Sequence, residues 1–391
     1  MIPSHPVGAP PGLRGRGFAL LIAATAVGLC GFAAVLPLVP LWAVRGGAGE
    51  FGAGTTTAAF MLTTVLTQLA MPRMLERGGY RWAFPVGALI MGLPAPLFAL
   101  SSDLAPLIAV SAVRGVGFGM VSVAGTAMAA RLVPPEQVGR ATGYYGLAVG
   151  LPQVVILPGG VALALDIGFD AAFWITGLCS LAGAALSLGV RFADGGRNRP
   201  LLDAPPRAAP GAGRGPSLAA PLVLMLLTAS SAGAVVTFVA VPLADTPWLV
   251  GASLAAYAAL VVVGRWSAGF SYDRHGRTLL LVPGMAAAVG GTALIAAGLW
   301  GPTACVPLGA ALFGLGFGAV QNETVTLMLN RAGPAGQGRA SAVWNIGYDA
   351  GAGAGAMLLG LLIQILGYGP AFAVLAAALA AVLPLARVSR R

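Results

Sequence analysis

Four ionisable side chains interrupt long apolar stretches of this 391-residue chain, and their types limit the chemistry that it can perform. They are Arg114, Arg265, Glu323 and Asp349. If these stretches lie in a bilayer, each charge costs about 2.5–3.5 kcal/mol on insertion scales and needs a compensating role. A carboxylate in such a place can take up and release protons, whereas arginine stays charged and binds anions or neighbouring acids instead. The four residues therefore predict proton or ion binding.

Asp349 belongs to the clearest polar pattern in the chain. Positions i, i+3, i+4 and i+7, which share one face of a helix, are occupied by Asn345, Tyr348, Asp349 and Ala352. A polar stripe is not stable against lipid, so this face must contact protein or a water-filled cavity. We expect Asp349 to exchange protons and Asn345 and Tyr348 to contact a substrate. The alternative is a structural carboxylate bonded to neighbouring helices.

The other three charges are less clearly placed. Glu323 follows Gln321 and Asn322, and three consecutive residues cover about 200° of a helix, so they cannot all face one cavity. We expect Glu323 to share proton coupling and Gln321 and Asn322 to bind substrate, with at least one of the three bonded to a neighbouring helix. Arg114 can hold a neighbouring acid in its charged form, bind an anionic group or anchor helices. Arg265 lies nearer the end of its stretch, where we expect a structural role with its head at the surface or paired with a loop carboxylate.

The composition requires a membrane protein. The chain is 58% hydrophobic and 9% charged, whereas soluble domains carry about 25% charge. Each segment that can span a bilayer needs about 20 apolar residues. Twelve qualify: 17–43, 53–75, 82–101, 104–130, 138–165, 171–193, 217–243, 247–272, 278–299, 303–329, 340–366 and 369–387. The fold class that we predict is therefore an all-α integral membrane protein with twelve transmembrane helices.

The longest connector divides these spans into two groups of six. Residues 194–216 are rich in Pro, Gly and Arg, which is typical of a flexible linker. We predict an N-terminal six-helix half over 1–193, a cytoplasmic linker over 194–216 and a C-terminal half over 217–391. With both termini in the cytoplasm, 19 of the 22 arginines fall in cytoplasmic segments, as the positive-inside rule requires. This topology accounts for the net charge of +10, so no nucleic-acid partner is expected.

The two halves repeat one another. The pattern G-x-G-F-G occurs at 115–119 and 314–318, and Gly139-Arg140-Ala141 matches Gly338-Arg339-Ala340 at the same offset. Because each half has an even number of spans, both insert the same way up. We therefore expect a pseudo-two-fold axis along the membrane normal and a cavity between the halves. Gln68 and Gln153 are expected to line that cavity and bind substrate; the alternative is ordinary hydrogen bonds between helices.

Two loops carry a motif that resembles a known family. The sequence G-F-S-Y-D-R-H-G-R at 269–277 is similar to the loop signature of the major facilitator superfamily, and within it of proton-coupled drug and metabolite efflux antiporters. The first-half copy at 72–81 departs from it at Pro72, Glu76 and Tyr80. The resemblance implies a twelve-helix fold of two pseudo-repeats and a coupling role for Arg114. It also implies a gating role for loop residues Asp273, Arg274, Arg277, Glu76 and Arg77; the alternative is that these arginines only set topology.

We predict from these patterns a secondary active transporter in the cell membrane, acting as a monomer by alternating access. Its function is proton-coupled efflux of a small organic molecule such as a drug, a metabolite or a sugar-like compound. The first alternative is a proton symporter that imports a metabolite on the same scaffold. A membrane enzyme or a non-transporting sensor is disfavoured, because His5, His275 and the three cysteines lie apart. We expect no metal, no cofactor and no catalytic residue; the partners are substrate, protons and lipid.

Overall fold

The computed structural model describes residues 12–78, 80–192 and 217–389, in which every regular element is a helix. The side chains of residues 76–80, 135, 334 and 335 are not described. The predicted linker over 194–216 lies outside the described residues. The elements are α1 (Arg16–Arg45), α2 (Gly49–Gly78), α3 (Tyr80–Gly92), η1 (Ala95–Leu100), α4 (Leu104–Arg131), η2 (Pro135–Gln137), α5 (Val138–Asp166), α6 (Phe169–Leu188), α7 (Ala219–Phe238), α8 (Pro247–His275), α9 (Leu281–Trp300), α10 (Cys305–Leu366) and α11 (Tyr368–Ser389).

These elements form twelve helices long and apolar enough to cross a membrane, counted over the described residues. The third consists of α3 continued by η1, and α10 supplies two, Cys305–Gly333 and Gly336–Leu366. The chain reverses between those two at Gly333, whose φ of 63° suits glycine because it has no Cβ. Every predicted span end lies within five residues of the observed one. The predicted all-helical membrane fold is confirmed.

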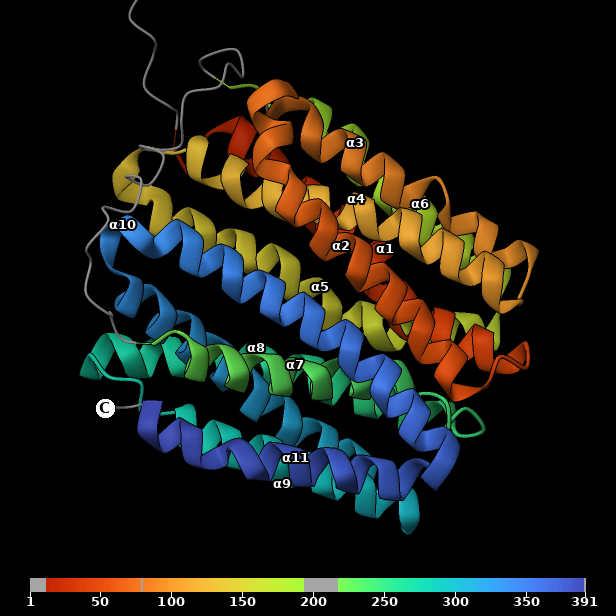
Figure 1. The fold of residues 1–391 in the computed structure, drawn as a ribbon. Helices are drawn as coiled ribbons and strands as arrows, with labels where there is room; N and C mark the ends of the chain where they lie inside the picture. The colour runs from red at the N-terminus through yellow and green to blue at the C-terminus, as the bar shows by residue number, and fades with distance from the viewer. Residues whose placement is uncertain (1–11, 79, 193–216, 390–391) are drawn as a thin grey trace, which may run out of the picture.

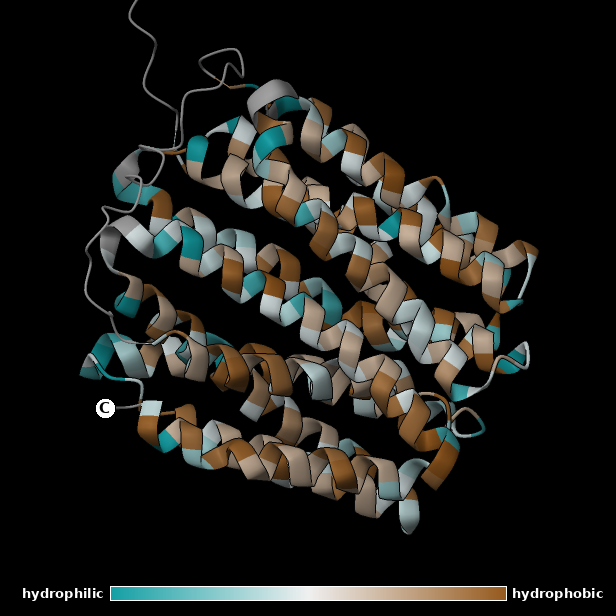
Figure 2. Cartoon of the chain, in the orientation of Figure 1, coloured by the Kyte–Doolittle hydropathy of each residue, from teal (hydrophilic) through white to brown (hydrophobic). Residues whose placement is uncertain are grey.

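The surface of the helix bundle is apolar along its sides. Figure 2 shows brown along the middle of the helices and teal mainly near their ends and loops. Large side chains are openly exposed there, such as Leu62 on α2 at 60% and Leu178 on α6 at 58%. Continuous apolar surface of this extent marks contact with a membrane or a partner, and with twelve spanning helices the lipid bilayer accounts for it.

The helices form two groups that meet along two seams (Figure 1). Helices α1–α6 form one group and α7–α11 the other; α2 packs against the second part of α10, and α5 packs against α8. The first seam is very close, because a Cβ added at Gly54 would lie 2.3 Å from the Ala356 carbonyl oxygen. A Cβ at Gly360 would likewise lie 2.4 Å from the Glu50 carbonyl oxygen. Small residues are what allow two helix backbones to approach this closely.

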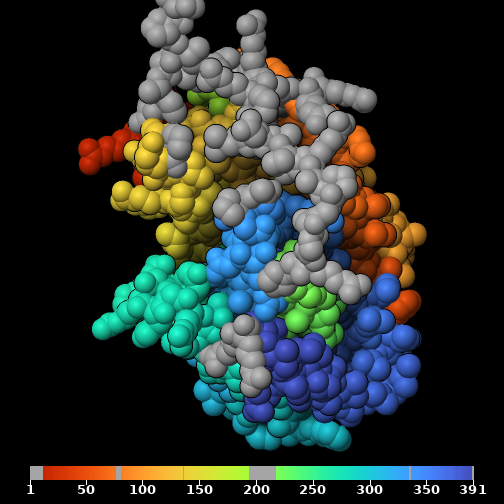
Figure 3. Space-filling model, turned by 60° about the vertical axis from the view of Figure 1, so that its left-hand side comes forward, coloured from red at the N-terminus to blue at the C-terminus, as the bar shows by residue number. Residues whose placement is uncertain are grey.

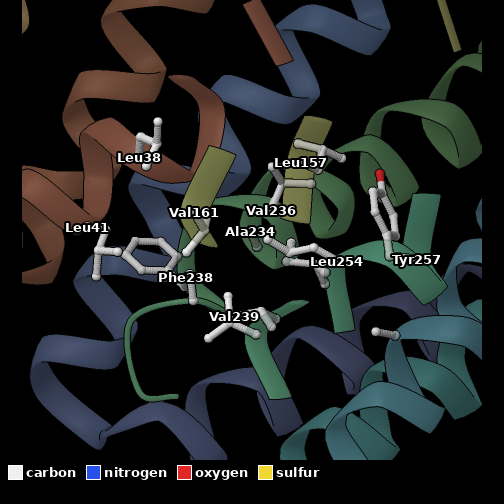
Figure 4. Packing of buried hydrophobic residues seen from close by; sticks show 14 of the residues in the cluster. Leu38, Leu41, Leu157, Val161, Ala234, Val236, Phe238, Val239, Leu254 and Tyr257 are labelled. Atoms are coloured by element: carbon white, nitrogen blue, oxygen red, sulfur yellow. The ribbon is translucent and has the colours of Figure 1, made fainter. Parts of the chain in front are cut away.

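The two groups share a core at one end only. We call the end at which α1 begins and α11 ends the terminal end, and the opposite end the far end. Near the far end a single apolar cluster joins both groups, with Leu38, Val161, Phe238 and Leu254 among its members (Figure 4).

Toward the terminal end the cores are separate. One cluster lies in the first group and includes Met91 and Met120, with Ala352 as its single member from the second group. The other, which includes Met285 and Val320, lies in the second group. Figure 3 looks toward this end, where α10 lies between the two groups. The buried apolar contact between the two groups is therefore concentrated at the far end.

Candidate functional site

A hydrogen bond joins the two groups of helices at mid-depth. Asp349, on the second part of α10, is 5% exposed, and its Oδ2 accepts a hydrogen bond of 2.7 Å from Nε2 of Gln68 on α2. Gln68 also lies 3.3 Å from Oγ of Ser122 on α4. Asp349 lies 13 residues into a 31-residue span, about 20 Å along its axis. Sequence reasoning assigned Asp349 to proton coupling and Gln68 to substrate binding, and the structure brings the two together.

The environment of this carboxylate suits a change of protonation. Asp349 forms no ion pair with any described residue, so its charged form lacks a cation that would offset desolvation. Gln68 offers an N–H to a carboxylate and a carbonyl oxygen to a carboxylic acid. In the present arrangement its Oε1 has no hydrogen-bond partner among the described residues. Rotation of the amide therefore lets Gln68 hold Asp349 in either protonation state.

A stack of aromatic rings borders the acid. Tyr348, next to Asp349, stacks on Trp344 with ring centroids 5.9 Å apart and on Phe317 with centroids 6.1 Å apart. Phe317 in turn stacks on Phe313 at 5.7 Å. The stack joins both parts of α10 and forms a flat, apolar wall beside the polar pair. Apart from Tyr348, these rings were not among the sequence-predicted site residues, because an aromatic residue in a spanning helix has the same pattern whether it faces lipid or a site.

Arg265 on α8 and Tyr348 are near enough for an electrostatic interaction between the two side chains. It is exposed and makes no hydrogen bond or ion pair with a described residue. The sequence indicated only that it lies nearer one end of its span, which suggested a structural role. The structure instead places an unpaired guanidinium next to the aromatic stack.

Of the three consecutive polar residues of α10, Glu323 and Asn322 point to different neighbours, as their angular spread predicted. Glu323 is 1% exposed, and its Oε1 accepts a hydrogen bond of 3.2 Å from the backbone N–H of Leu280, at the start of α9. Asn322 approaches α8, because a Cβ added at Gly269 would lie 3.5 Å from its Nδ2. Gln321 is buried. The geometry of Glu323 favours the structural alternative, and its coupling role stays a prediction.

Replacing Glu323 is expected to affect stability more than transport. The carboxylate accepts from an N–H at the start of α9, where a negative charge also interacts favourably with the helix dipole. Glu323→Ala should lower the free energy of unfolding by about 1 kcal/mol, and Glu323→Gln by less because it keeps an acceptor. Thermal unfolding of the purified protein in detergent measures this, with the exposed Glu136→Ala as control. Equal melting temperatures for Glu323→Ala and wild type would exclude the capping role.

Arg114 lies inside the first group of helices. It is fully buried, and its Nη2 donates a hydrogen bond of 3.1 Å to the carbonyl oxygen of Gly31 on α1. Its guanidinium carbon lies 5.6 Å from the centre of the Phe98 ring on η1. Nε and Nη1 have no hydrogen-bond partner among the described residues. These contacts favour an anchoring role, and they do not bring Arg114 to Asp349; its coupling role stays a prediction.

The remaining predicted residues make local contacts or none. Gln153 donates to the Val149 carbonyl oxygen at 3.1 Å, and Asn345 to that of Ser341 at 2.8 Å, each within its own helix. The predicted gating residues Asp273, Arg274 and Arg277 are exposed at the terminal end of α8. The side chains of Glu76 and Arg77 lie outside the described residues. Among the described residues, no group of three or more His, Cys, Asp or Glu could hold a metal ion.

Twelve spanning helices in two groups, which share an apolar core at one end and have polar side chains between them at mid-depth, define the architecture of a secondary transporter. The family model of the Major Facilitator Superfamily matches residues 18–356, and the chain belongs to this superfamily. No curated protein sequence matches the chain.

Several solved transporter structures share the fold. The nucleoside transporter NupG has a TM-score of 0.74 at 11% identity, over 95% of this chain and 98% of its own. A bacterial homolog of the human lysosomal transporter Spinster, in an inward-facing and unoccupied conformation, has a TM-score of 0.73 at 15% identity, over 97% of this chain and 96% of its own. The human organic anion transporter MFSD10 has a TM-score of 0.65 at 14% identity, over 95% of this chain and 99% of its own. At these identities the comparisons show the fold alone.

Proposed function

We propose that this chain is a proton-coupled secondary transporter that exports a small organic molecule across the cell membrane by alternating access. The observation that carries the proposal is the hydrogen bond between Asp349 and Gln68. It places a buried acid without a cationic partner on the seam along which the two groups of helices separate.

Coupling follows from what happens to this bond when the groups move. When α2 and α10 part at mid-depth, Asp349 loses Gln68 and gains water, so its charged form becomes less costly. The protonation state of Asp349 and the conformation of the molecule therefore influence each other, as linkage requires. A proton entering from one side of the membrane is released on the other, and this drives the cycle.

The arginine distribution and the separate cores at the terminal end support export. The terminal end carries most arginines, so it faces the cytoplasm, together with both chain termini. Asn345 and Arg265 are exposed, and because the cores are separate at that end we expect a substrate to reach them from the cytoplasm, the side from which an exporter loads. Asp273, Arg274 and Arg277, with Glu76 and Arg77, then latch the terminal end in the opposite conformation.

Import by proton symport is the second candidate, and Arg265 favours it. An unpaired cation in the site suits an anionic substrate, and an anion binds more readily when Asp349 is protonated than when it is charged. Under this alternative, proton and substrate occupy the site together and cross in the same direction.

Vesicles that contain the purified full chain and a trapped pH dye distinguish these functions. Concentration gradients of neutral, cationic and anionic small molecules are imposed across the vesicle membrane one at a time, and the dye records the movement of protons. Export by antiport predicts that outward substrate movement brings protons in. Movement of both in one direction establishes symport instead, and substrate movement without any proton flux excludes proton coupling.

A further inference from the structure

Arg265 faces the space between the two groups of helices. Three residues earlier, Val262 lies toward α5, because its Cγ2 is 4.0 Å from a Cβ added at Gly150. Four residues later, Gly269 lies toward Asn322 on the first part of α10. Positions 262, 265 and 269 share one stripe of α8, so the Arg265 side chain leaves the helix between α5 and α10.

The lipid-facing side of α8 is a different one. The large exposed apolar side chains of α8 are Trp248, Val263, Trp266 and Phe270, which lie on another face of the helix. The exposure of Arg265 therefore arises on the side of the other helix group and not at the lipid surface. A guanidinium at this depth is costly without a partner, and the described residues provide neither a carboxylate nor a hydrogen bond for it.

The surroundings of Arg265 combine a cation with aromatic rings, two features that can bind one ligand. Tyr348 is near enough to both Arg265 and Asp349 to interact electrostatically with each of them. Trp344, stacked on Tyr348, is held in place because its Nε1 donates a hydrogen bond of 3.0 Å to Thr324 Oγ1. A fixed aromatic wall next to an unpaired guanidinium is complementary to a flat molecule that carries a negative group.

We propose that the central site binds a small aromatic carboxylate, whose carboxylate group pairs with Arg265 and whose ring stacks against Tyr348 and Trp344. The planar guanidinium matches a carboxylate with two parallel hydrogen bonds, and ring stacking adds affinity and orientation. The same cation repels positively charged molecules. This inference rests on the proposed role of the chain as a transporter, in either direction, and specifies its substrate class.

Binding to the purified full chain in detergent tests the inference with three probes. Benzoate carries ring and charge, benzamide carries the ring alone, and acetate carries the charge alone. We expect benzoate to bind about tenfold or more tightly than either of the others, because a charge-assisted pair and a stacking contact each contribute measurably. Calorimetric titration measures the three affinities.

Substitutions of Arg265 and Tyr348 show how much each residue contributes to benzoate affinity. Arg265→Gln should weaken benzoate binding about tenfold to a hundredfold and leave benzamide binding unchanged, since benzamide has no charge to lose. Arg265→Lys should fall between wild type and Arg265→Gln, because lysine lacks the planar donor pair. Tyr348→Ala should weaken benzoate and benzamide alike. The exposed Arg140→Gln is the matched control and should bind benzoate as wild type does.

Equal affinity for benzoate and benzamide, or wild-type benzoate affinity in Arg265→Gln, would overturn the inference. So would acetate binding as tightly as benzoate, because the aromatic wall would then contribute nothing. Failure of the proposed transporter function can be distinguished from failure of the proposed binding site. If vesicles show no transport but benzoate binds in an Arg265-dependent way, the site stands and the proposed function fails. If a cation is transported equally by wild type and Arg265→Gln, the function stands and the site is wrong.

Discussion

Asp349→Asn is expected to abolish proton-coupled transport while leaving substrate exchange intact. Asparagine has nearly the same volume and can still hydrogen-bond to Gln68, so the contact between α2 and α10 persists. It cannot take up or release a proton, and the link between protonation and conformation is lost. We expect substrate-driven proton flux to fall about tenfold or more, in line with the size of ordinary coupling between sites.

The measurement uses vesicles with a trapped pH dye and, separately, exchange of labelled substrate at equal concentrations on both sides. Exchange requires the conformational change but no net proton movement, so it should remain within about twofold of wild type. Asp166→Asn, an exposed acid at the far end of α5, is the matched control. Full proton flux in Asp349→Asn would remove this residue from the proton path, and loss of exchange as well would indicate a structural role.

Gly54→Leu is expected to stop transport by holding the far end open. A Cβ at this position would already lie 2.3 Å from the Ala356 carbonyl oxygen, so a larger side chain prevents α2 and α10 from closing. The clash lies between the two groups of helices, which can separate, and not within one of them. The variant should therefore fold but lose about tenfold or more of its transport rate, because the sealed conformation is no longer accessible.

Thiol labelling reports the conformation directly. Thr57 is buried, and its hydroxyl oxygen lies 3.3 Å from that of Thr237 on α7, in the other group of helices. With the native cysteines replaced by serine, Thr57→Cys should resist an impermeant reagent added from the far side and should react in combination with Gly54→Leu. Gly159→Leu is the control, since a Cβ there meets nothing within 4 Å. Unchanged transport and continued protection in Gly54→Leu would show that the seam does not limit closure.

Depth along a helix could be predicted from the sequence, and the direction of a side chain around the helix could not. The predicted spans 340–366 and 104–130 place Asp349 and Arg114 well away from the span ends, and both residues are buried. Arg265 was expected to reach the surface or to pair with a loop acid, because its distance from the span end was the only information available. Its actual direction depends on where α5 and α10 lie, which the periodicity of α8 does not contain.

The long-range partners of these side chains could not be predicted from the sequence either. Gln68 and Asp349 are separated by 281 positions, and each was assigned a separate role from its own helix. The twelve spans were predictable because each depends only on local hydrophobicity. The partner of Arg114 is a backbone carbonyl of Gly31, and every residue carries such a group, so residue types alone could not identify it.

Arg265 and Asp349 both interact electrostatically with Tyr348, and the charges that this site binds determine how the cycle responds to voltage. An aromatic carboxylate leaving in exchange for one entering proton transfers two elementary charges in the same electrical direction, worth about 4.6 kcal/mol per 100 mV. The same carboxylate crossing with a proton transfers none. A potassium diffusion potential, negative inside, should therefore accelerate export several-fold and leave symport unchanged. The dependence of the transport rate on membrane potential therefore distinguishes export by antiport from import by symport.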